Sequence, residues 1–366
     1  MKIGIIGIRG IPNQYGGFEQ FVEFVGPALA ERGHDVTVYN SSLHPYKESS
    51  WKGVHIISRY DPENRIGTAG QFIYDLNCIL DARKRNYDVI LQLGYTSSSI
   101  WSALFPKKAV LVTNMDGLEW KRSKYSPRVQ QFLLKAERWA ALKSDKLIAD
   151  SIGIQEYLRS KYNRDAAFIA YGASLFTEPD ASASSKYGLS NYGYNLLIAR
   201  MEPENNIETV LKGYRDASIA APLVLIGNHT NKFGSYLKST YESDRIRFLG
   251  PVYDFGLLNN LRHFSHLYFH GHSVGGTNPS LLEAMASQAL IVAHDNIFNK
   301  SVLGSDAFYF STPEQITALL NSKIDKPAYS SYIRNNNNKI AEHYSWKHIT
   351  DLLENYLSQA LYEPNN

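Results

Sequence analysis

Cysteine is nearly absent from this sequence of 366 residues, and long apolar runs are missing. The single Cys78 excludes an intramolecular disulfide and a cysteine-based zinc cluster, so the chain suits a reducing compartment. No stretch approaches the roughly 20 apolar residues of a membrane span. The apolar run before Arg9 is too short for the core of a signal peptide. We therefore expect a cytoplasmic protein that is either soluble or attached to the inner face of the plasma membrane.

The sequence also has no strong net charge, and the common catalytic motifs are missing. The net charge of +3 is too small to indicate wholesale nucleic-acid binding. HExxH, paired CxxC and P-loop motifs do not occur. His270, His272 and His294 have no partner at metal-ligand spacing, so we interpret each as structural. The sequence predicts no metal, no resident cofactor and no nucleic-acid partner.

Short β-branched runs alternate with amphipathic stretches along the chain. Residues 2–8 predict a buried strand, 18–32 a helix, and 35–40 the next strand. Strand, helix and strand over about 40 residues form a βαβ unit, which implies a parallel sheet. We therefore predict an α/β fold.

The alternation stops at an Ala- and Ser-rich segment, 173–190, that we interpret as a linker, and then restarts. Outside it, only Asn335–Asn338 has low-complexity composition. The sequence therefore predicts two doubly wound, Rossmann-like domains and a C-terminal helix that packs back toward the first domain. Their predicted bounds are 1–175, 176–345 and 346–366.

A glycine-rich loop, Gly7 to Gly17, connects the first strand to the first helix. Such a loop directs backbone amides and the helix dipole at an anion, although a plain tight turn would contain the same residues. A dinucleotide site fits poorly, because the second strand ends in Asn40 where an acid is expected. Arg9 can pair with a phosphate or with a surface carboxylate.

A second polar segment, 114–120, follows another predicted strand at its carboxyl end, where open α/β sheets bind ligands. Asp116 and Glu119 can accept hydrogen bonds from sugar hydroxyls, and Trp120 can stack on a sugar. A turn followed by a helix cap explains the same residues equally well.

Residues 120–146 carry eight Lys and Arg against two acids, with four aromatic rings between them. A basic amphipathic stretch of this kind can lie on an anionic membrane surface. A solvated helix face is an equally good interpretation.

In the second half, Arg200 stands at the carboxyl tip of a predicted strand, where it can hold a diphosphate. A small-residue loop later leads into a helix with Pro279 in its first turn and Glu283 one turn on. The backbone amides of 278–282 can hold phosphate, and a half-buried Glu283 can accept from ribose hydroxyls.

Together these segments resemble the retaining glycosyltransferases of the GT-B fold, family-four type. The branch they resemble is the bacterial rhamnosyltransferase-like one, whose N-terminal domain is of the DUF1972 kind. The segments that carry the resemblance, in family order, are RGIPNQYGGFE (9–19), NMDGLEWKR (114–122), IADS (148–151), YGA (171–173), LIARMEPENN (197–206), FLGPVYD (248–254) and GGTNPSLLEAMAS (275–287).

The resemblance implies an acceptor-binding N-terminal domain and a nucleotide-sugar-binding C-terminal domain. It implies transfer of a hexosyl group without a metal, and we expect L-rhamnose from dTDP-rhamnose in surface polysaccharide synthesis. The basic stretch at 120–146 leads us to expect a polyprenyl-diphosphate-linked saccharide as the acceptor. The implied catalytic residues are Asp116 and Arg200. The implied donor-binding residues are Gly16, Gly17, Arg200, Asn278, Pro279, Ser280, Leu281, Leu282 and Glu283. The implied acceptor or sugar contacts are Arg9, Glu119, Trp120, Gly275, Gly276 and Thr277.

The sequence departs from the family pattern at two places. Gly275 stands where the first acid of the usual E-x7-E pair belongs, and Glu204, Asn205 and Asn206 replace a basic residue after the Arg200 strand. A 6-deoxy sugar fits the first departure, because it needs less hydroxyl recognition. A GT-B nucleotide-sugar epimerase and a non-catalytic nucleotide-sugar-binding protein are the alternatives. Product analysis separates them, since an epimerase consumes no acceptor and releases no nucleotide.

Overall fold

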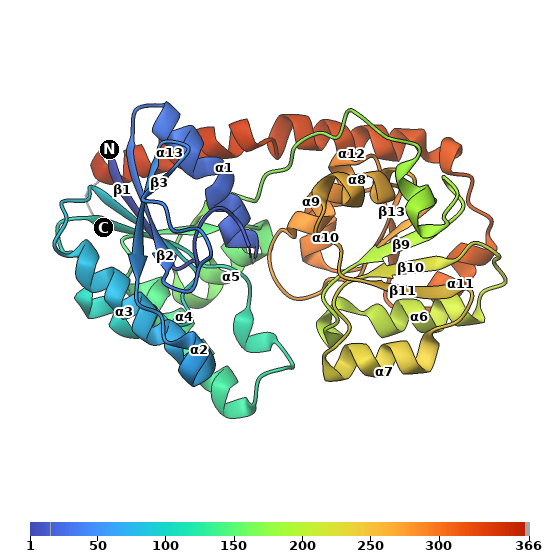
Figure 1. The fold of residues 1–366 in the computed structure, drawn as a ribbon, viewed down its shortest axis with the longest axis horizontal. Coiled ribbons are helices and arrows are strands. Elements are labelled where there is room, and N and C mark those ends of the chain that lie inside the picture. The colour runs from blue at the N-terminus through green and yellow to red at the C-terminus, as the bar shows by residue number, and fades with distance from the viewer. Residues whose placement is uncertain (15, 363–366) are drawn as a thin grey trace. The chain divides into compact units, whose positions relative to one another are not determined.

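The computed structural model describes residues 1–14 and 16–362, so Tyr15 of the glycine-rich loop and the end of the predicted C-terminal helix, 363–366, lie outside it. The chain forms two compact units (Figure 1). Unit 1 contains Met1–Lys121, Tyr125–Tyr171 and the segment from Trp346, and unit 2 contains Arg122–Lys124 and Gly172–Ser345.

Unit 1 is built on an eight-stranded sheet in the order β3-β4-β2-β1-β5-β6-β7-β8. All neighbouring strands are parallel except β3 and β4. The strands are β1 (Lys2–Ile6), β2 (Asp35–Ser41), β3 (Ser50–Trp51), β4 (Val54–Arg59), β5 (Val89–Leu93), β6 (Val110–Asn114), β7 (Lys146–Ala149) and β8 (Ala167–Phe168).

The helices of unit 1 include the predicted ones at the start, middle and end of the chain. They are α1 (Gly17–Glu31), α2 (Glu63–Ile66), α3 (Gly70–Ala82), α4 (Pro127–Lys143), α5 (Ile152–Tyr162) and α13 (Trp346–Tyr362). Three short 3₁₀ helices join them: η1 (Gly67–Ala69), η2 (Ser99–Leu104) and η3 (Glu119–Lys121). None of the helices in the described ranges has both the length and the apolar character that crossing a membrane requires.

The last helix, α13, packs on the first, α1. The indole of Trp346 stacks on Phe24 with ring centroids 4.3 Å apart. Arg32, just after α1, donates to Asp351 at 2.6 Å and to Glu354 at 2.5 Å. Unit 1 is therefore completed by a segment that follows all of unit 2 in the sequence.

Unit 2 is built on a six-stranded parallel sheet in the order β11-β10-β9-β12-β13-β14. Counted from its first strand this is 3-2-1-4-5-6, the strand order of dinucleotide-binding sheets. The strands are β9 (Asn195–Ile198), β10 (Leu223–Ile226), β11 (Ile246–Gly250), β12 (Tyr268–His270), β13 (Ile291–His294) and β14 (Phe308–Phe310).

The helices of unit 2 alternate with these strands. They are α6 (Ile207–Asp216), α7 (Lys232–Tyr241), α8 (Phe255–His263), α9 (Pro279–Ala286), α10 (Ile297–Leu303), α11 (Pro313–Asn321) and α12 (Ser330–His343), with the 3₁₀ helices η4 (Ala183–Tyr187), η5 (Pro203–Asn205) and η6 (Lys326–Tyr329). The prediction of an α/β protein with two doubly wound units is confirmed.

Two segments differ from the sequence-based interpretation. The asparagine run 335–338 lies inside α12, where Asn336 is buried and its amide donates to the Asp306 carbonyl at 2.7 Å. The expected linker, 173–190, packs on unit 2, because the Phe176 amide donates to Ala286 and the Asp180 amide to Asn260. The polar composition of both segments gave no sign of this packing, because their hydrogen bonds are made to residues far away in the sequence.

Each sheet has one point where the strand order reverses. In unit 1 it lies between β1 and β5, and in unit 2 between β9 and β12. Connections leave the two strands there in opposite directions, which opens a crevice at their carboxyl ends. These two points are where a ligand site is expected.

Candidate functional site

The switch point of unit 2 brings together two segments that are about 70 residues apart in the sequence. Strand β9 pairs with β12 through Leu196 and Tyr268, and through Leu197 and Phe269. Arg200 follows the end of β9, and His270 ends β12. The predicted diphosphate-binding arginine thus stands at the ligand-binding edge of the sheet.

Asparagine side chains hold the backbone of this edge in place. Asn205 donates to the Arg200 carbonyl at 2.7 Å, and Asn206 to the Gly271 carbonyl at 2.8 Å. Asn296 and Asn299 both donate to the His272 carbonyl, at 2.9 and 3.0 Å. The loops that carry Arg200 and His272 are therefore preorganised by the protein itself.

Further cations reach this edge from a segment far away in sequence. Arg122 and Lys124, which belong to unit 2, lie 3.5 and 3.6 Å from the Glu202 carboxylate. Between them, Ser123 donates to Glu204 at 3.0 Å. Two cations from residues 122–124 thus lie beside the segment that follows Arg200, which no local pattern could have revealed.

Two stacked imidazoles lie at the end of β12. The rings of His270 and His272 are 4.5 Å apart and inclined by 18°. Burial, with the charge of Arg200 and then of Arg122, lowers the pKa of His272 to about 3. Burial, His272 and Arg262 lower the pKa of His270 well below its ordinary value. Both rings are therefore neutral at pH 7.

The start of α9 is capped by its own residue Asn278. The Asn278 side chain caps the helix by accepting from the Ser280 amide at 2.9 Å, and the Asn278 carbonyl accepts from the amides of Leu281 and Leu282. Pro279 has no amide proton. The amides of Ser280, Leu281 and Leu282 therefore donate within the helix start in this structure, because the cap satisfies them internally.

The side chains at this helix start also point inward. Leu281 and Leu282 are buried in the core of unit 2, at 1% and 0% exposure. The Ser280 hydroxyl bonds with the Tyr268 hydroxyl at 2.9 Å. The side chains of Ser280, Leu281 and Leu282 thus pack within unit 2.

Glu283 is half-buried, as predicted, and is paired with an arginine. Arg262, at 1% exposure, donates to the Glu283 carboxylate at 2.5 Å and to Asn259 at 3.0 Å. Nothing in the local sequence singled out Arg262, because it lies in an amphipathic helix among ordinary polar residues. It fixes the direction of the Glu283 carboxylate.

The loop before α9 has a backbone that requires glycine. Gly275 has φ +125°, a conformation that L side chains rarely adopt. Its neighbour Gly276 is half-buried, and Thr277 is 3% exposed. The absence of an acid at 275 is therefore tied to the shape of the loop.

The switch point of unit 1 contains the glycine-rich loop. Gly10 lies so close to Asn40 that a Cβ there would be 2.5 Å from the Asn40 side chain. Asn40 accepts from the Ile11 amide at 3.0 Å and donates to its carbonyl at 2.8 Å. Asn40 thus clamps the loop, which explains why no acid stands there.

Arg9 and Glu19 line a cavity of about 150 Å³ beside this loop, together with Gly10, Gln14, Ser41, Leu43, His44, Pro45 and Asp61. The Arg9 guanidinium forms a two-pronged ion pair with the Glu63 carboxylate. The sequence allowed Arg9 to pair with a phosphate or with a carboxylate, and in this structure its partner is a carboxylate. Glu19 accepts from the Arg9 amide at 2.9 Å, and burial raises its pKa.

The two loop glycines that begin α1 pack closely. Gly16 is its N-cap, and a Cβ on Gly17 would be 3.3 Å from the Tyr171 ring. The sequence singled out Tyr171 only as part of the segment YGA (171–173).

Asp116 lies in a group of carboxyls. It has φ +52°, and its amide donates to the Asn114 side chain at 3.1 Å. Burial, and then the charge of Asp116, raise the pKa of Asp150 and that of Tyr171 well above their ordinary values. The carboxyl of Asp116 thus lies close enough to that of Asp150 for its charge to disfavour ionisation of Asp150.

Glu119 and Trp120 were predicted to contact a sugar. In this structure Glu119 is buried and the Trp120 ring is engaged by other side chains of unit 1. Glu119 is 9% exposed. The Trp120 indole donates to Glu137 at 3.0 Å, and the Lys161 ammonium lies 5.1 Å from its ring centre. A cation therefore already occupies a face of the ring expected to stack on a sugar.

No group of three or more His, Cys, Asp or Glu among residues 1–14 and 16–362 is arranged to hold a metal ion.

Two doubly wound units, each with a polar loop cluster at its switch point, define the GT-B fold, and solved structures share it over the whole chain. Sucrose-phosphate synthase from Thermosynechococcus elongatus matches with a TM-score of 0.79 and 17% identity, covering 99% of each chain. HepE of Anabaena in complex with UDP-glucose matches with a TM-score of 0.74 and 14% identity, covering 98% of this chain and 99% of that one. Trehalose 6-phosphate synthase from Burkholderia multivorans matches with a TM-score of 0.71 and 12% identity, covering 99% and 97%.

In sequence, residues 1–174 match the family described as a domain of unknown function, DUF1972. This confirms the N-terminal part of the resemblance. No curated protein matches the chain. At these identities the structural matches establish the fold alone.

Proposed function

We propose that the chain is a retaining glycosyltransferase that moves a hexosyl group from a nucleotide-sugar donor to a saccharide acceptor. The observation that carries the proposal is the cluster of Arg200, Arg122 and rigid loops at the switch point of unit 2. This is the place where sheets of this order bind phosphorylated ligands. A protein of the same fold, HepE, binds UDP-glucose and UDP, which supports this class of donor.

The donor's diphosphate is bound by Arg200 and Arg122 and by the loop Gly275–Asn278, in place of the α9 amides. Guanidinium groups suit this task because their fixed donors match phosphate oxygens. Glu283, aligned by Arg262, accepts from the ribose hydroxyls. The donor sugar we propose is L-rhamnose carried by dTDP, because the glycine at 275 removes an acid that a hydroxyl-rich sugar would use.

Transfer breaks the bond between the anomeric carbon and the diphosphate and forms a bond to the acceptor oxygen on the same face. The proton of the acceptor hydroxyl passes to the departing diphosphate. Arg200 and Arg122 stabilise the charge that develops on that diphosphate, the largest contribution that preorganised donors make. Asp116 orients the acceptor, and no metal is needed.

A thermal-shift panel tests this function. A ligand that binds only the folded protein raises its melting temperature, by an amount set by ligand concentration over Kd. We expect dTDP-rhamnose or another nucleotide sugar to stabilise the protein, with free rhamnose inactive and with the same shift in EDTA as in Mg²⁺. Failure of dTDP-, UDP- and GDP-sugars alike to shift the melting temperature would remove the proposal. Release of free nucleoside diphosphate only when an acceptor is present then separates a transferase from an epimerase.

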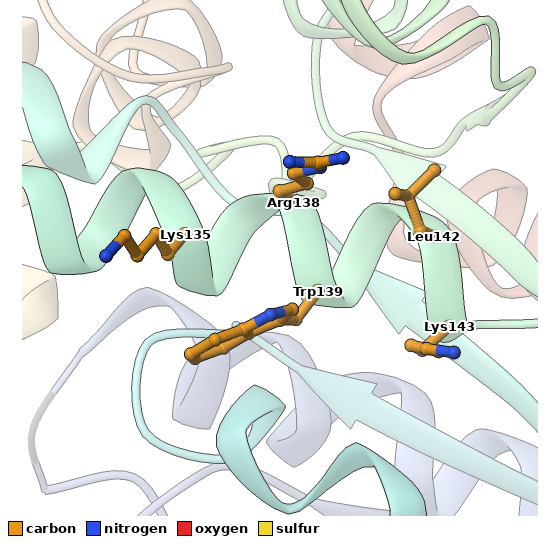
Figure 2. Close-up of a pocket in the computed structure, with 5 residues that line it drawn as sticks. All are labelled: Lys135, Arg138, Trp139, Leu142 and Lys143. Atoms are coloured by element: carbon orange, nitrogen blue, oxygen red, sulfur yellow. The ribbon is translucent and has the colours of Figure 1, made fainter.

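We further propose that unit 1 meets a polyprenyl-diphosphate-linked acceptor at an anionic membrane surface, through α4. Its exposed cations are Arg128, Lys135, Arg138 and Lys143, while its one acid, Glu137, is 2% exposed and bonds inside the protein. Figure 2 shows how Lys135, Trp139 and Lys143 stand along this helix beside a hollow of about 450 Å³.

Exposed apolar side chains accompany these charges. Val129 and Leu142 on α4 are 40% and 46% exposed, and Ile100 on η2 is 44% exposed. Helix α4 is in contact with η2, and the Phe72 ring of α3 lies 5.7 Å from Phe132 of α4. Cations with apolar side chains between them are the combination that anionic bilayers bind. Arg122 and Lys124 are not part of it, because they belong to unit 2.

Reversing three charges of α4, with Lys135→Glu, Arg138→Glu and Lys143→Glu, is expected to abolish this binding. Each basic residue near an anionic bilayer contributes about 1 kcal/mol, so three reversals weaken partition by on the order of 100-fold or more. Co-flotation with phosphatidylglycerol vesicles measures it. The control reverses three exposed lysines of unit 2, Lys186, Lys232 and Lys323. Equal flotation of both triple variants would contradict the assignment to α4.

A further inference from the structure

The stacked pair His270 and His272 has a buried hydrogen-bonding capacity that the protein does not use. His270 is 1% exposed, yet neither of its ring nitrogens has a hydrogen-bond partner in the described part of the chain. The Nδ1 atom of His272 is likewise buried without a partner. Leaving a buried polar group unsatisfied costs about 1–3 kcal/mol, so such groups call for a reason.

The surroundings of the pair argue against a purely structural role. The carbonyls of Gly271 and His272 are held by Asn206, Asn296 and Asn299. The backbone is thus fully supported, while the side chains it presents are left unsatisfied. Structural histidines show the reverse, because their nitrogens bond to the backbone, as His263 does with Ser287 at 3.1 Å.

The position of the pair identifies which part of a ligand it meets. It ends β12, directly beside β9 and Arg200, at the switch point of the sheet. The charge of Arg200 and Arg122 acts on His272, so an anion at this edge has guanidinium partners close to the imidazoles. The diphosphate of a nucleotide sugar is flanked by the ribose and by the transferred sugar. Because Glu283 is the proposed ribose contact, the imidazoles are left to meet the transferred sugar.

The neutral state of the rings fits hydroxyls. A neutral imidazole has one donor and one acceptor nitrogen, and a hydroxyl also both donates and accepts. Gly275 provides no carboxylate for this task and has a backbone that disfavours one. We propose that His270 and His272 form the hydroxyl-recognition subsite for the transferred sugar, in place of an acid at 275. This inference rests on the proposed function and names the residues that select its sugar.

Two substitutions test the subsite: His272→Phe, which keeps the ring stack, and His270→Leu, which is similar in volume. Calorimetric titration compares dTDP with dTDP-rhamnose, and UDP with UDP-glucose. In each variant we expect the preference for the nucleotide sugar over the nucleotide to fall by on the order of tenfold, because one or two hydrogen bonds are lost. Binding of the bare nucleotide stays within about twofold, since the guanidinium groups are unchanged.

Stability provides a second readout that a structural role would not give. The ligand-free variants are expected to melt at the same temperature as the unmodified protein or higher, because unsatisfied polar atoms have been removed. A lower melting temperature with an unchanged sugar preference would overturn the proposal. Equal binding of nucleotide and nucleotide sugar by the unmodified protein would overturn it too, yet leave the proposed nucleotide site standing. Failure of all four ligands to bind would remove the proposed function as well.

Discussion

Replacing Arg200 by alanine is expected to weaken binding of dTDP or UDP by about 10- to 100-fold, because a charge-assisted hydrogen bond contributes about 1.5–3 kcal/mol. The transfer rate falls further, by on the order of 100- to 1,000-fold, because the lost group stabilises charge that develops during the reaction. Calorimetry measures the first effect, and release of nucleoside diphosphate in the presence of acceptor measures the second.

The structure supplies controls for this substitution. Arg200 is exposed, so its replacement should leave the melting temperature of the ligand-free protein unchanged. Arg334→Ala removes another exposed arginine of unit 2, on α12, and should leave both binding and rate intact. Arg200→Lys keeps the charge but loses the planar fork, so it should recover only part of the binding. Unaltered nucleotide binding by Arg200→Ala would mean that the diphosphate lies elsewhere.

Arg262→Leu is expected to lower the free energy of unfolding by about 3–5 kcal/mol, because it leaves the Glu283 carboxylate without its buried partner. Arg262 is among the largest fully buried side chains in the described chain, and it joins α8 to α9 through Glu283 and Ser280. Denaturant unfolding without ligand measures the loss. Arg334→Leu is the matched control and should change stability by less than about 0.5 kcal/mol.

The double variant Arg262→Leu with Glu283→Met tests the cause of that loss. Replacing both members of a buried pair by apolar residues is often neutral, whereas removing one is costly. Most of the lost stability should therefore return in the double variant, although nucleotide binding should not. If the double variant is as unstable as Arg262→Leu alone, the packing of Arg262, rather than its charge, holds the two helices together.

Periodicity predicted the elements with a clear apolar face and missed those without one. Helix α1 buries Phe21, Val22, Val25 and Leu29 on one side, and the sequence shows that spacing directly. Helix α12 buries only Asn336 and Ile340, so its asparagine run looks irregular until the bond from Asn336 to Asp306 is known. Strand order, by contrast, follows from βαβ units, and so the fold class could be predicted.

The candidate site was predictable where a residue's role depends on its own strand or helix. Arg200 and Glu283 could be placed as candidates from their positions after a strand and on a helix. The histidine pair was interpreted as structural, because the sequence does not show that β12 lies beside β9. The cap at α9 could not be predicted for the same kind of reason, since the Asn278 rotamer that satisfies Ser280 is a feature of the folded loop.

The return of the chain from unit 2 to unit 1 sets an order of assembly. A ribosome synthesises the chain from its N-terminus, and domains generally fold as they emerge. Here the whole of Gly172–Ser345 is made before Trp346 can cover Phe24. Unit 2 can thus mature first, although synthesis of unit 1 began earlier. Until Trp346 is in place, the ring of Phe24 on α1 is left without its stacking partner and stays in contact with water.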